Sequence, residues 1–251
     1  KLSMNLKYKD DWKQARERLK AWWQGEIVDR AVILVTAPKN PEEKEKEENH
    51  IEEDWTQADY EDYFMNPDRV IPRMEEHIKN TYWAGEAVPV GYPVSTGMVA
   101  ILSNYLGCPL QFVDKNTTWS KPVIDDWQDR PEFKFNPENK WWQKSKVLLK
   151  EAAARAHGKD LVGLPDLNGP SEILSRLRRE DRLALDTLEN KEEFKQALKE
   201  VNYAWYRYWT ACHGVIHPHV SGYFSMLGIW SEIQHTDLPR DFSIMISSEA
   251  Y

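Results

Sequence analysis

Apolar residues recur at helical spacing in several stretches of the chain. In residues 10–24, Trp12, Ala15, Leu19 and Trp22 fall on one stripe, and apolar positions three or four apart lie on one face of a helix. The same spacing predicts further helices over residues 66–82, 96–106, 139–157, 171–177 and 190–211. These segments would supply the helical layer of an α/β protein.

Shorter apolar runs between these helices mark the strands. Residues 31–37 read Ala-Val-Ile-Leu-Val-Thr-Ala, and a continuous β-branched run is typical of a strand that is buried on both faces of a parallel sheet. Further extended segments are predicted at residues 84–95, 110–113, 117–124, 161–167, 220–229 and 242–246. Strands that recur with helices between them predict a mainly parallel sheet with right-handed crossovers.

Two carboxylates come at the ends of predicted strands. Asp166 and Asn168 lie where residues 161–167 meet their loop, which is where α/β proteins place binding and catalytic groups. Asp241 precedes the last extended segment. We predict catalytic roles for Asp166 and Asp241 and a substrate-binding role for Asn168. Ordinary roles as turn or helix-capping residues stay open for all three.

Aromatic residues add a wall to this predicted site. The chain has 12 Trp, and Trp suits flat organic ligands and sugars as well as protein cores. Tyr92 lies where residues 84–95 run into a loop, and Tyr223 and Trp230 follow later extended segments. Because the ends of successive strands converge on one mouth, we expect these three residues to bind substrate.

Histidines provide a candidate metal or anion site. His217 and His219 flank Pro218, a spacing that places both imidazoles on one face of an extended segment. Together they could bind substrate or share a metal. A third metal ligand would come from His235, Asp237 or Asp241, so the sequence leaves the metal unknown.

Composition narrows the class of partner. A net charge of −8 with no dense Lys/Arg cluster excludes an electrostatic footprint for nucleic acid or an anionic membrane. No apolar run is long enough to span a bilayer. Cys108 and Cys212 are too far apart for a Cys-x-x-Cys motif, and a cytoplasmic location is the expectation. Nucleotide-binding glycine motifs and a Gly-x-Ser-x-Gly elbow are also absent. The expected partner is a small-molecule substrate, and a homodimer stays open.

The domain organisation follows from these patterns. We expect one α/β domain over residues 1–251, with residues 1–29 as an N-terminal helical extension. Residues 38–65 are predicted to be a polar excursion, because 38–54 contain Glu-Glu-Lys-Glu-Lys-Glu-Glu and almost nothing apolar.

Four blocks of sequence together resemble the uroporphyrinogen decarboxylase superfamily, which also holds the cobalamin-dependent (corrinoid) methyltransferases. The blocks lie within residues 15–32 (Ala-Arg-Glu-Arg-Leu, Gly-Glu and Asp-Arg-Ala-Val), 97–107 (Gly-Met and Leu-Gly), 161–167 (Leu-Val-Gly-Leu-Pro-Asp-Leu) and 241–247 (Asp-Phe-Ser-Ile-Met-Ile-Ser). The resemblance implies a TIM-type (β/α)8 barrel with its site at the carboxyl ends of the strands. On our strand count, the chain covers the first five or six strands of such a barrel and lacks its C-terminal part.

Departures from the family pattern select between its branches. Decarboxylases have an arginine-rich loop after the first strand that grips porphyrin carboxylates, whereas residues 38–50 are rich in Glu and Lys. The resemblance therefore favours a corrinoid-linked methyltransferase that acts on a small methylated substrate. Such an enzyme implies zinc, held by a His-x-Cys pair and a later Cys expected beyond Tyr251, and a cobalamin-bearing partner protein. Uroporphyrinogen decarboxylation, which needs no cofactor, and carbohydrate binding or hydrolysis are the alternatives.

Overall fold

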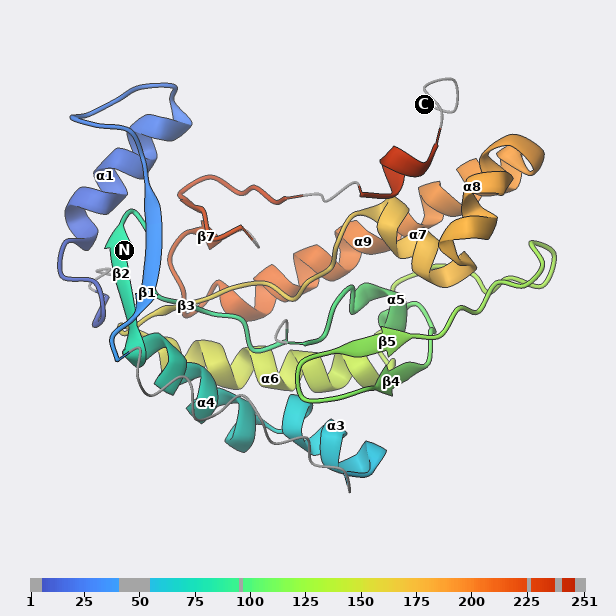
Figure 1. Cartoon of the computed structure of the whole chain (residues 1–251), viewed down its shortest axis with the longest axis horizontal. Helices are drawn as coiled ribbons and strands as arrows, with labels where there is room; N and C mark the ends of the chain where they lie inside the picture. The colour runs from blue at the N-terminus through green and yellow to red at the C-terminus, as the bar shows by residue number, and fades with distance from the viewer. Residues whose placement is uncertain (1–5, 41–54, 95–96, 225–226, 238–240, 247–251) are drawn as a thin grey trace.

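The computed structural model describes residues 6–40, 55–94, 97–224, 227–237 and 241–246. Helices form most of this structure, and short strands lie between them (Figure 1). The long helices α6 (Lys140–Ala156) and α9 (Lys191–Ile216) contact each other along the middle of the molecule. The chain is thus a mixed α/β protein, as the sequence pattern predicts.

The N-terminal end of the molecule consists of a helix and a pair of antiparallel strands. Helix α1 (Trp12–Trp23) buries Trp12, Ala15 and Leu19 of the predicted stripe, whereas Trp22 at its end is exposed. Strands β1 (Leu34–Pro38) and β2 (Thr81–Gly85) pair antiparallel. Every residue of β1 is exposed, so the prediction of a parallel strand buried on both faces is wrong. A β-branched run sets the extended backbone, but tertiary contacts decide whether its faces are covered.

Two helices follow at the lower edge of the molecule in Figure 1. Helix α3 (Gln57–Met65) begins with a capping box at Thr56 and buries Phe64 and Met65. It lies in the C-terminal part of the predicted polar excursion, which therefore contributes to the core; residues 41–54 lie outside the described residues. Helix α4 (Pro67–Asn80) begins at the predicted cap, and its chain leads directly into β2.

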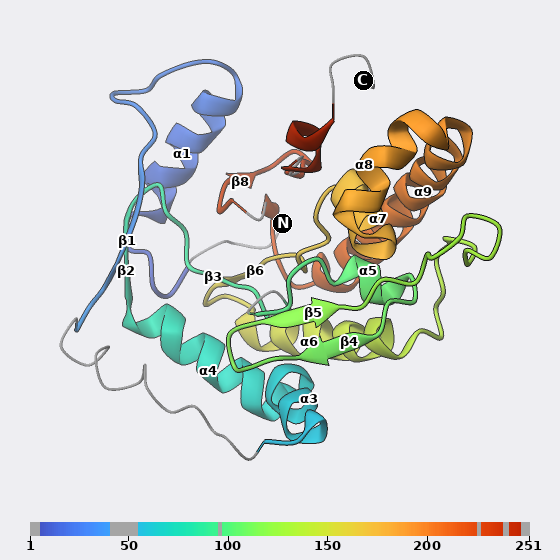
Figure 2. The ribbon, with the colours of Figure 1, turned by 45° about the vertical axis from the view of Figure 1, so that its right-hand side comes forward.

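The central strands form a small parallel pair. Strand β3 (Val90–Gly91) and strand β6 (Leu161–Val162) are parallel neighbours, joined by backbone hydrogen bonds from Leu161 N to Pro89 O (2.9 Å) and from Gly163 N to Gly91 O (2.8 Å). Between them come the short helix α5 (Leu102–Tyr105) and the antiparallel strands β4 (Leu110–Phe112) and β5 (Thr118–Ser120). This hairpin lies across α6, next to α3 (Figure 2).

The C-terminal part wraps back over α9. Helices α7 (Pro170–Arg178) and α8 (Glu180–Glu189) precede α9, and strands β7 (Tyr223–Phe224) and β8 (Trp230–Ser231) pair antiparallel after it. Helix α9 continues to Ile216, beyond its predicted end at residue 211, and β7 lies within the extended segment predicted at residues 220–229. The last segment predicted as a strand forms the 3-10 helix η1 (Asp241–Met245) instead.

The predicted barrel is not closed within the part of the chain that the structure describes. Its strands form four two-stranded sheets, three antiparallel and one parallel. Among the described strands, only β3 and β6 show the parallel pairing expected of a barrel, so the prediction of a mainly parallel sheet is wrong. Several extended segments were predictable from periodicity, whereas strand partners depend on contacts between residues far apart in the chain.

Candidate functional site

The carboxyl ends of β3 and β6 meet at one edge of the parallel pair. Tyr92 follows β3 directly, and Gly163 follows β6. A Cβ atom at Gly163 would overlap the ring of Tyr92, so the glycine allows the two chain segments to approach closely. The Tyr92 ring also lies 6.3 Å from the ring of Phe224 in β7. This edge therefore brings together three segments distant in sequence.

Asp166 holds the loop after β6. Its side chain is buried, and its carboxylate accepts hydrogen bonds from Ala100 N (3.2 Å) and Asn168 N (3.1 Å). Burial raises the pKa of Asp166, while these two backbone donors act in the opposite direction. The carboxylate links α5's entry segment to the loop, and its catalytic role stays a prediction.

Asn168 joins this loop to α9. It adopts a φ of 52°, a left-handed conformation that asparagine tolerates better than most residues. Its backbone oxygen accepts a hydrogen bond from the indole nitrogen of Trp205 (2.8 Å), and its side-chain oxygen accepts one from Gly169 N. The predicted strand end is therefore anchored on the long helix.

A ladder of rings continues from Trp205 along α9. Trp205 stacks on Trp209 with ring centroids 5.8 Å apart, and Trp209 meets His213 edge-on at 4.6 Å. The ring of Tyr223 contacts both His213 (5.1 Å) and His217 (5.5 Å). Residues four apart share one face of a helix, so this face points from the loop of Asn168 towards β7. We call His213, His217 and Tyr223 the imidazole–tyrosine cluster; Tyr92 lies beside it, with its ring against Phe224, the residue that follows Tyr223 in β7.

The segment after β8 closes one side of this cluster. His235 lies near enough to His213 to affect its pKa, and its ring contacts Trp23 of α1 at 4.8 Å. Asp237 accepts a hydrogen bond from Leu227 N (2.9 Å), and its charge acts on Tyr92. The segment thus adds one imidazole and one carboxylate from the far end of the chain.

Burial keeps His213 and Tyr92 uncharged at neutral pH. Burial, aided by His217 and His235, lowers the pKa of His213 to about 4. Burial and the charge of Asp237 raise the pKa of Tyr92 well above its ordinary value. At neutral pH this region consequently contains an uncharged imidazole, that of His213, and an uncharged phenol, that of Tyr92.

Two other predicted site residues, Trp230 and Asp241, lie apart from the cluster in the contacts that the structure shows. Trp230 is buried against Trp12 (5.1 Å) and donates a hydrogen bond to Ser221 O (3.2 Å), so it packs the core. Asp241 is exposed at the start of η1, where its charge contributes to raising the pKa of Glu172. No contact given by the structure joins Asp241 to Asp166 among the described residues.

The predicted histidine pair is split. His217 ends α9 and stacks on Tyr223 at 16°, whereas the backbone oxygen of His219 contacts a ring nitrogen of His157 at 3.2 Å. The two imidazoles do not share the face of an extended strand, because the helix continues to Ile216. The structure instead brings His217 towards His213 and His235.

The described residues do not fit a zinc site. Within them, no group of three His, Cys, Asp or Glu side chains is arranged to hold a metal ion. Cys108 and Cys212 are both buried, and burial raises the pKa of the Cys108 thiol to about 12. Zinc binds the thiolate rather than the thiol, so neither cysteine is prepared as a ligand, and no zinc-dependent step is assigned.

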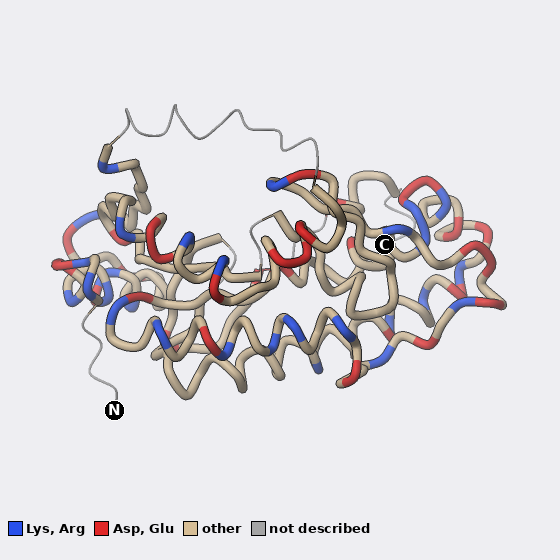
Figure 3. The backbone as a smooth tube through the Cα atoms, turned by 90° about the horizontal axis from the view of Figure 1, so that it is seen from below, with Lys and Arg blue, Asp and Glu red and all other residues tan. Residues whose placement is uncertain are grey.

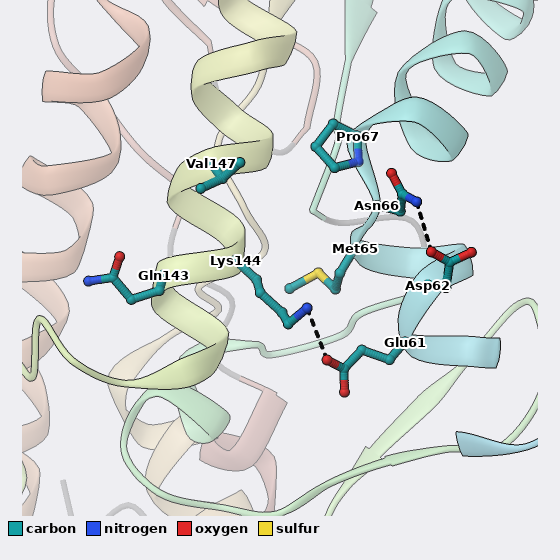
Figure 4. Close-up of a pocket in the computed structure, with 8 residues that line it drawn as sticks. All are labelled: Glu61, Asp62, Met65, Asn66, Pro67, Gln143, Lys144 and Val147. Atoms are coloured by element: carbon teal, nitrogen blue, oxygen red, sulfur yellow. Dashed lines mark hydrogen bonds and ion pairs between the residues drawn. The ribbon is translucent and has the colours of Figure 1, made fainter. Parts of the chain in front are cut away.

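Two surface pockets are lined by residues outside this edge. One, of about 430 Å³, is formed between α3, the start of α4 and α6 (Figure 4). Its Glu61 pairs with Lys144 (3.0 Å), and Asp62 accepts a hydrogen bond from Asn66 (2.7 Å) and pairs with Arg69. A second, of about 570 Å³, lies between β1, β2 and α4. Because both carboxylates of the first pocket already have partners, we place no chemistry in it.

Sequence reasoning missed Trp209 and His213. The signal was present as an aromatic or imidazole ring at every fourth residue from Trp205 to His217. It was overlooked because the helix was expected to end at residue 211, which would have left His213 in a loop.

Comparisons with known proteins give one structural match. No family model matches the chain, and no curated protein matches it. The fold is similar to that of a methyltransferase from Methanosarcina mazei, with a TM-score of 0.50 and 15% identity over 84% of this chain. The match covers 57% of that protein. At this identity the likeness concerns the fold.

Two further features concern the helices and the charges. No helix in the described part of the chain is both long and apolar enough to cross a membrane. Basic and acidic residues alternate along the backbone rather than gathering by sign in the view of Figure 3.

Proposed function

We propose that this protein transfers a methyl group from a small methylated compound that binds at the imidazole–tyrosine cluster. The supporting observation is that β7, which carries Tyr223 of the cluster, packs through Phe224 against Tyr92 (6.3 Å), which follows β3 at the carboxyl edge of the parallel strands, within a fold similar to that of a methyltransferase. Ligands of open α/β sheets bind outside the carboxyl ends of the strands.

The cluster has properties suited to such a substrate. The rings of Tyr223 and Trp209 offer apolar faces to a methyl group, and His213 stays neutral at physiological pH. A neutral imidazole can donate or accept a hydrogen bond without attracting an anion. We assign His213 and Tyr92 to orienting the donor molecule and the aromatic rings to excluding water from it.

Corrinoid linkage is part of this proposal and rests on the sequence resemblance. A cobalamin-bearing partner would supply the methyl acceptor when bound. The residues described above would bind and orient the methyl donor. Uroporphyrinogen decarboxylation and carbohydrate binding or hydrolysis stay as alternatives, but no contact among the described residues favours either.

The test is a methyl-transfer assay on the natural full-length protein with cobalamin and a panel of methylated amines and ethers. We expect turnover with at least one donor, and a loss of about tenfold or more in kcat/KM for His213→Gln. The matched control is His77→Gln, an exposed histidine on α4, which should keep normal turnover.

Other results would contradict the proposal. Absence of turnover with every donor, together with conversion of uroporphyrinogen to coproporphyrinogen, would identify a decarboxylase. Equal activity of His213→Gln and the unmodified protein would remove the cluster from the site.

A further inference from the structure

We propose that β1 pairs through its open edge with β1 of a second copy of this chain. The product is a two-fold symmetric homodimer with a continuous four-stranded antiparallel sheet. A two-stranded sheet has two edges, each with unpaired backbone groups that can pair with another strand. The structure closes one of these edges and leaves the other open.

The edge of β2 is closed by a lysine. Lys9 is only 3% exposed, and its ammonium donates hydrogen bonds to Trp83 O (3.0 Å) and Gly85 O (2.6 Å). These carbonyls lie two residues apart on the side of β2 that faces away from β1. A buried ammonium at this position excludes a further strand, so β2 is the protected edge.

The edge of β1 has no such cover among the described residues. Two backbone hydrogen bonds show which residues of β1 face β2. They run from Glu86 N to Ile33 O (2.8 Å) and from Lys39 N to Asn80 O (2.8 Å), so the odd-numbered residues of this stretch bond to β2. In an antiparallel pair, every second residue directs its backbone groups away from the partner. In β1 those residues are Leu34, Thr36 and Pro38, and Pro38 has no N–H to donate.

The side chains around this edge are apolar and exposed. Residues 31–38 contain no charged side chain, in a protein where 29% of the residues are charged. In β1, directly before it and on the strand paired with it, Ile33, Leu34, Val35 and Tyr82 are exposed apolar side chains. Exposed apolar side chains gathered at one place are typical of an interaction site.

The charges of the loop before β1 are paired within the chain. Arg18 pairs with Asp29 (2.7 Å), and Arg30 pairs with the buried Glu86 (2.7 Å). Natural edge strands avoid pairing with their own copies by carrying charges, especially lysine. β1 itself carries no charge, and Lys39, which follows it, donates a hydrogen bond to Lys79 O (2.6 Å). With β1 centred on its own copy, Lys39 lies opposite the uncharged Ala31, so no like charges face each other, which is why we assign the edge to a second copy.

The unpaired backbone N–H and C=O groups of β1 predict the register of the dimer. With the two-fold axis at Val35, Leu34 of each copy lies opposite Thr36 of the other. Each opposed pair exchanges two backbone hydrogen bonds, and the missing N–H of Pro38 is avoided. The two Val35 residues then form a non-hydrogen-bonded pair with Cα atoms about 4.5 Å apart, a separation that a disulfide can bridge.

The first test is oxidative cross-linking of Val35→Cys. We expect most of this variant to form a disulfide-linked dimer under mild oxidation. The control is Leu188→Cys on α8, which introduces a thiol at another exposed apolar position and should stay mostly uncrosslinked. Cys108 and Cys212 are buried, so they should contribute little to either result.

The second test is sedimentation velocity over a dilution series of the unmodified protein and Thr36→Pro. Proline at residue 36 removes an outward N–H but no bond to β2, and proline is tolerated where the N–H faces away from the sheet. We expect a concentration-dependent dimer, weakened about tenfold or more by Thr36→Pro, with an unchanged circular dichroism spectrum.

Two results would overturn the proposal. One is a monomer at all concentrations, with fast amide exchange at residues 34 and 36. The other is a dimer in which Val35→Cys cross-links no better than Leu188→Cys, which would place the interface elsewhere on the molecule.

Discussion

Two buried carboxylates show how hydrogen-bond partners decide whether burial raises or lowers a pKa, and so whether the charge stabilises the fold. Glu86 is fully buried, and it accepts hydrogen bonds from Arg30 and from Ile33 N (2.9 Å). Burial alone would raise its pKa, but these bonds bring the pKa below its ordinary 4.5. Asp160 is also buried, and one of its oxygens has no hydrogen-bond partner. Its pKa rises to about 7, chiefly through burial and then through Glu75.

Replacing Glu86 by Gln should destabilise the fold. The substitution leaves Arg18 and Arg30 without their buried counter-charge, and we expect the free energy of unfolding to fall by about 2–4 kcal/mol at pH 7. Because the folded pKa is lowered, this contribution should disappear as the pH falls below about 4.5. Urea denaturation measures both effects.

The control for this prediction is Glu232→Gln. Glu232 pairs with Arg16 and Lys20 at the surface, and its side chain is 42% exposed. Its loss should cost about 1 kcal/mol or less. Equal losses of unfolding free energy in Glu86→Gln and Glu232→Gln would show that burying Glu86 does not increase its contribution to stability.

Replacing Asp160 by Asn should stabilise the fold at alkaline pH, whereas Glu86→Gln destabilises it. Because the folded pKa lies above the ordinary 3.8, the folded state binds a proton more tightly, and stability falls as the pH rises from about 4 to about 7. Asn cannot ionise, so Asp160→Asn should raise the free energy of unfolding at pH 8 by about 1–3 kcal/mol and change little at pH 4.

The exposed Asp129 provides the comparison. Asp129→Asn should leave the pH dependence of stability as in the unmodified protein. If Asp160→Asn were as pH-dependent as the unmodified protein, Asp160 would not be the titrating group.

Contacts between elements hold the C-terminal segment against α1. Trp230 of β8 meets Trp12 edge-on, and Trp23 donates a hydrogen bond to Trp230 O (2.9 Å). Gly222, at a φ of 88°, makes room for the Trp230 indole, which a Cβ atom would overlap. The approach of β7 and β8 to α1 therefore depends on a glycine before β7.

Substitutions at two glycines in this segment distinguish the cost of a positive φ from the cost of steric overlap with a neighbouring side chain. Gly222→Ala combines an unfavourable φ with overlap of the Trp230 ring, and we expect a loss of about 2–4 kcal/mol in the free energy of unfolding. Gly228→Ala has a φ of 81° but open space around it, so its cost should be about 1 kcal/mol. Thermal and urea unfolding of both variants measure the difference.

Activity provides a further readout of this pair. If β7 positions Tyr223 in the imidazole–tyrosine cluster, Gly222→Ala should also lower turnover, whereas Gly228→Ala should not. A Gly222→Ala variant as stable as Gly228→Ala would show that the Trp230 ring moves aside at little cost.

The molecule as a whole carries a net charge of −8, which affects its association with a second copy. Two copies with the same net charge repel each other, and salt screens that repulsion over about 10 Å at 0.1 M ionic strength. The proposed interface itself is uncharged. Raising the ionic strength should consequently strengthen the dimer about two- to fivefold, as measured by sedimentation equilibrium. A dimer that weakened with salt would indicate an interface held by ion pairs.

Helices were the part of the fold that the sequence determined by itself. The stripe of α1, the cap of α4 at Asn66 and the cap of α6 at Asn139 are local features, and a helix satisfies its backbone groups within one segment. Helices α3 and α8 were missed, and α9 extends beyond its predicted end.

Part of the candidate site was also encoded locally. Asp166 and Asn168 follow β6 as predicted, because a short apolar run and its polar end are readable from neighbouring residues. His213 was missed, although its spacing from Trp209 and His217 was visible in the sequence. Its importance comes from Tyr223 and His235, which local patterns do not place beside it.

Only the tertiary structure decided the partners and exposure of the strands. The run 31–37 reads as a buried parallel strand, yet β1 is antiparallel to β2 and exposed. A strand satisfies its backbone groups on another segment, so its partner, its direction and its covered face depend on residues far away in the chain. The sequence determined that residues 34–38 would be extended, and the fold determined that their edge would face outwards.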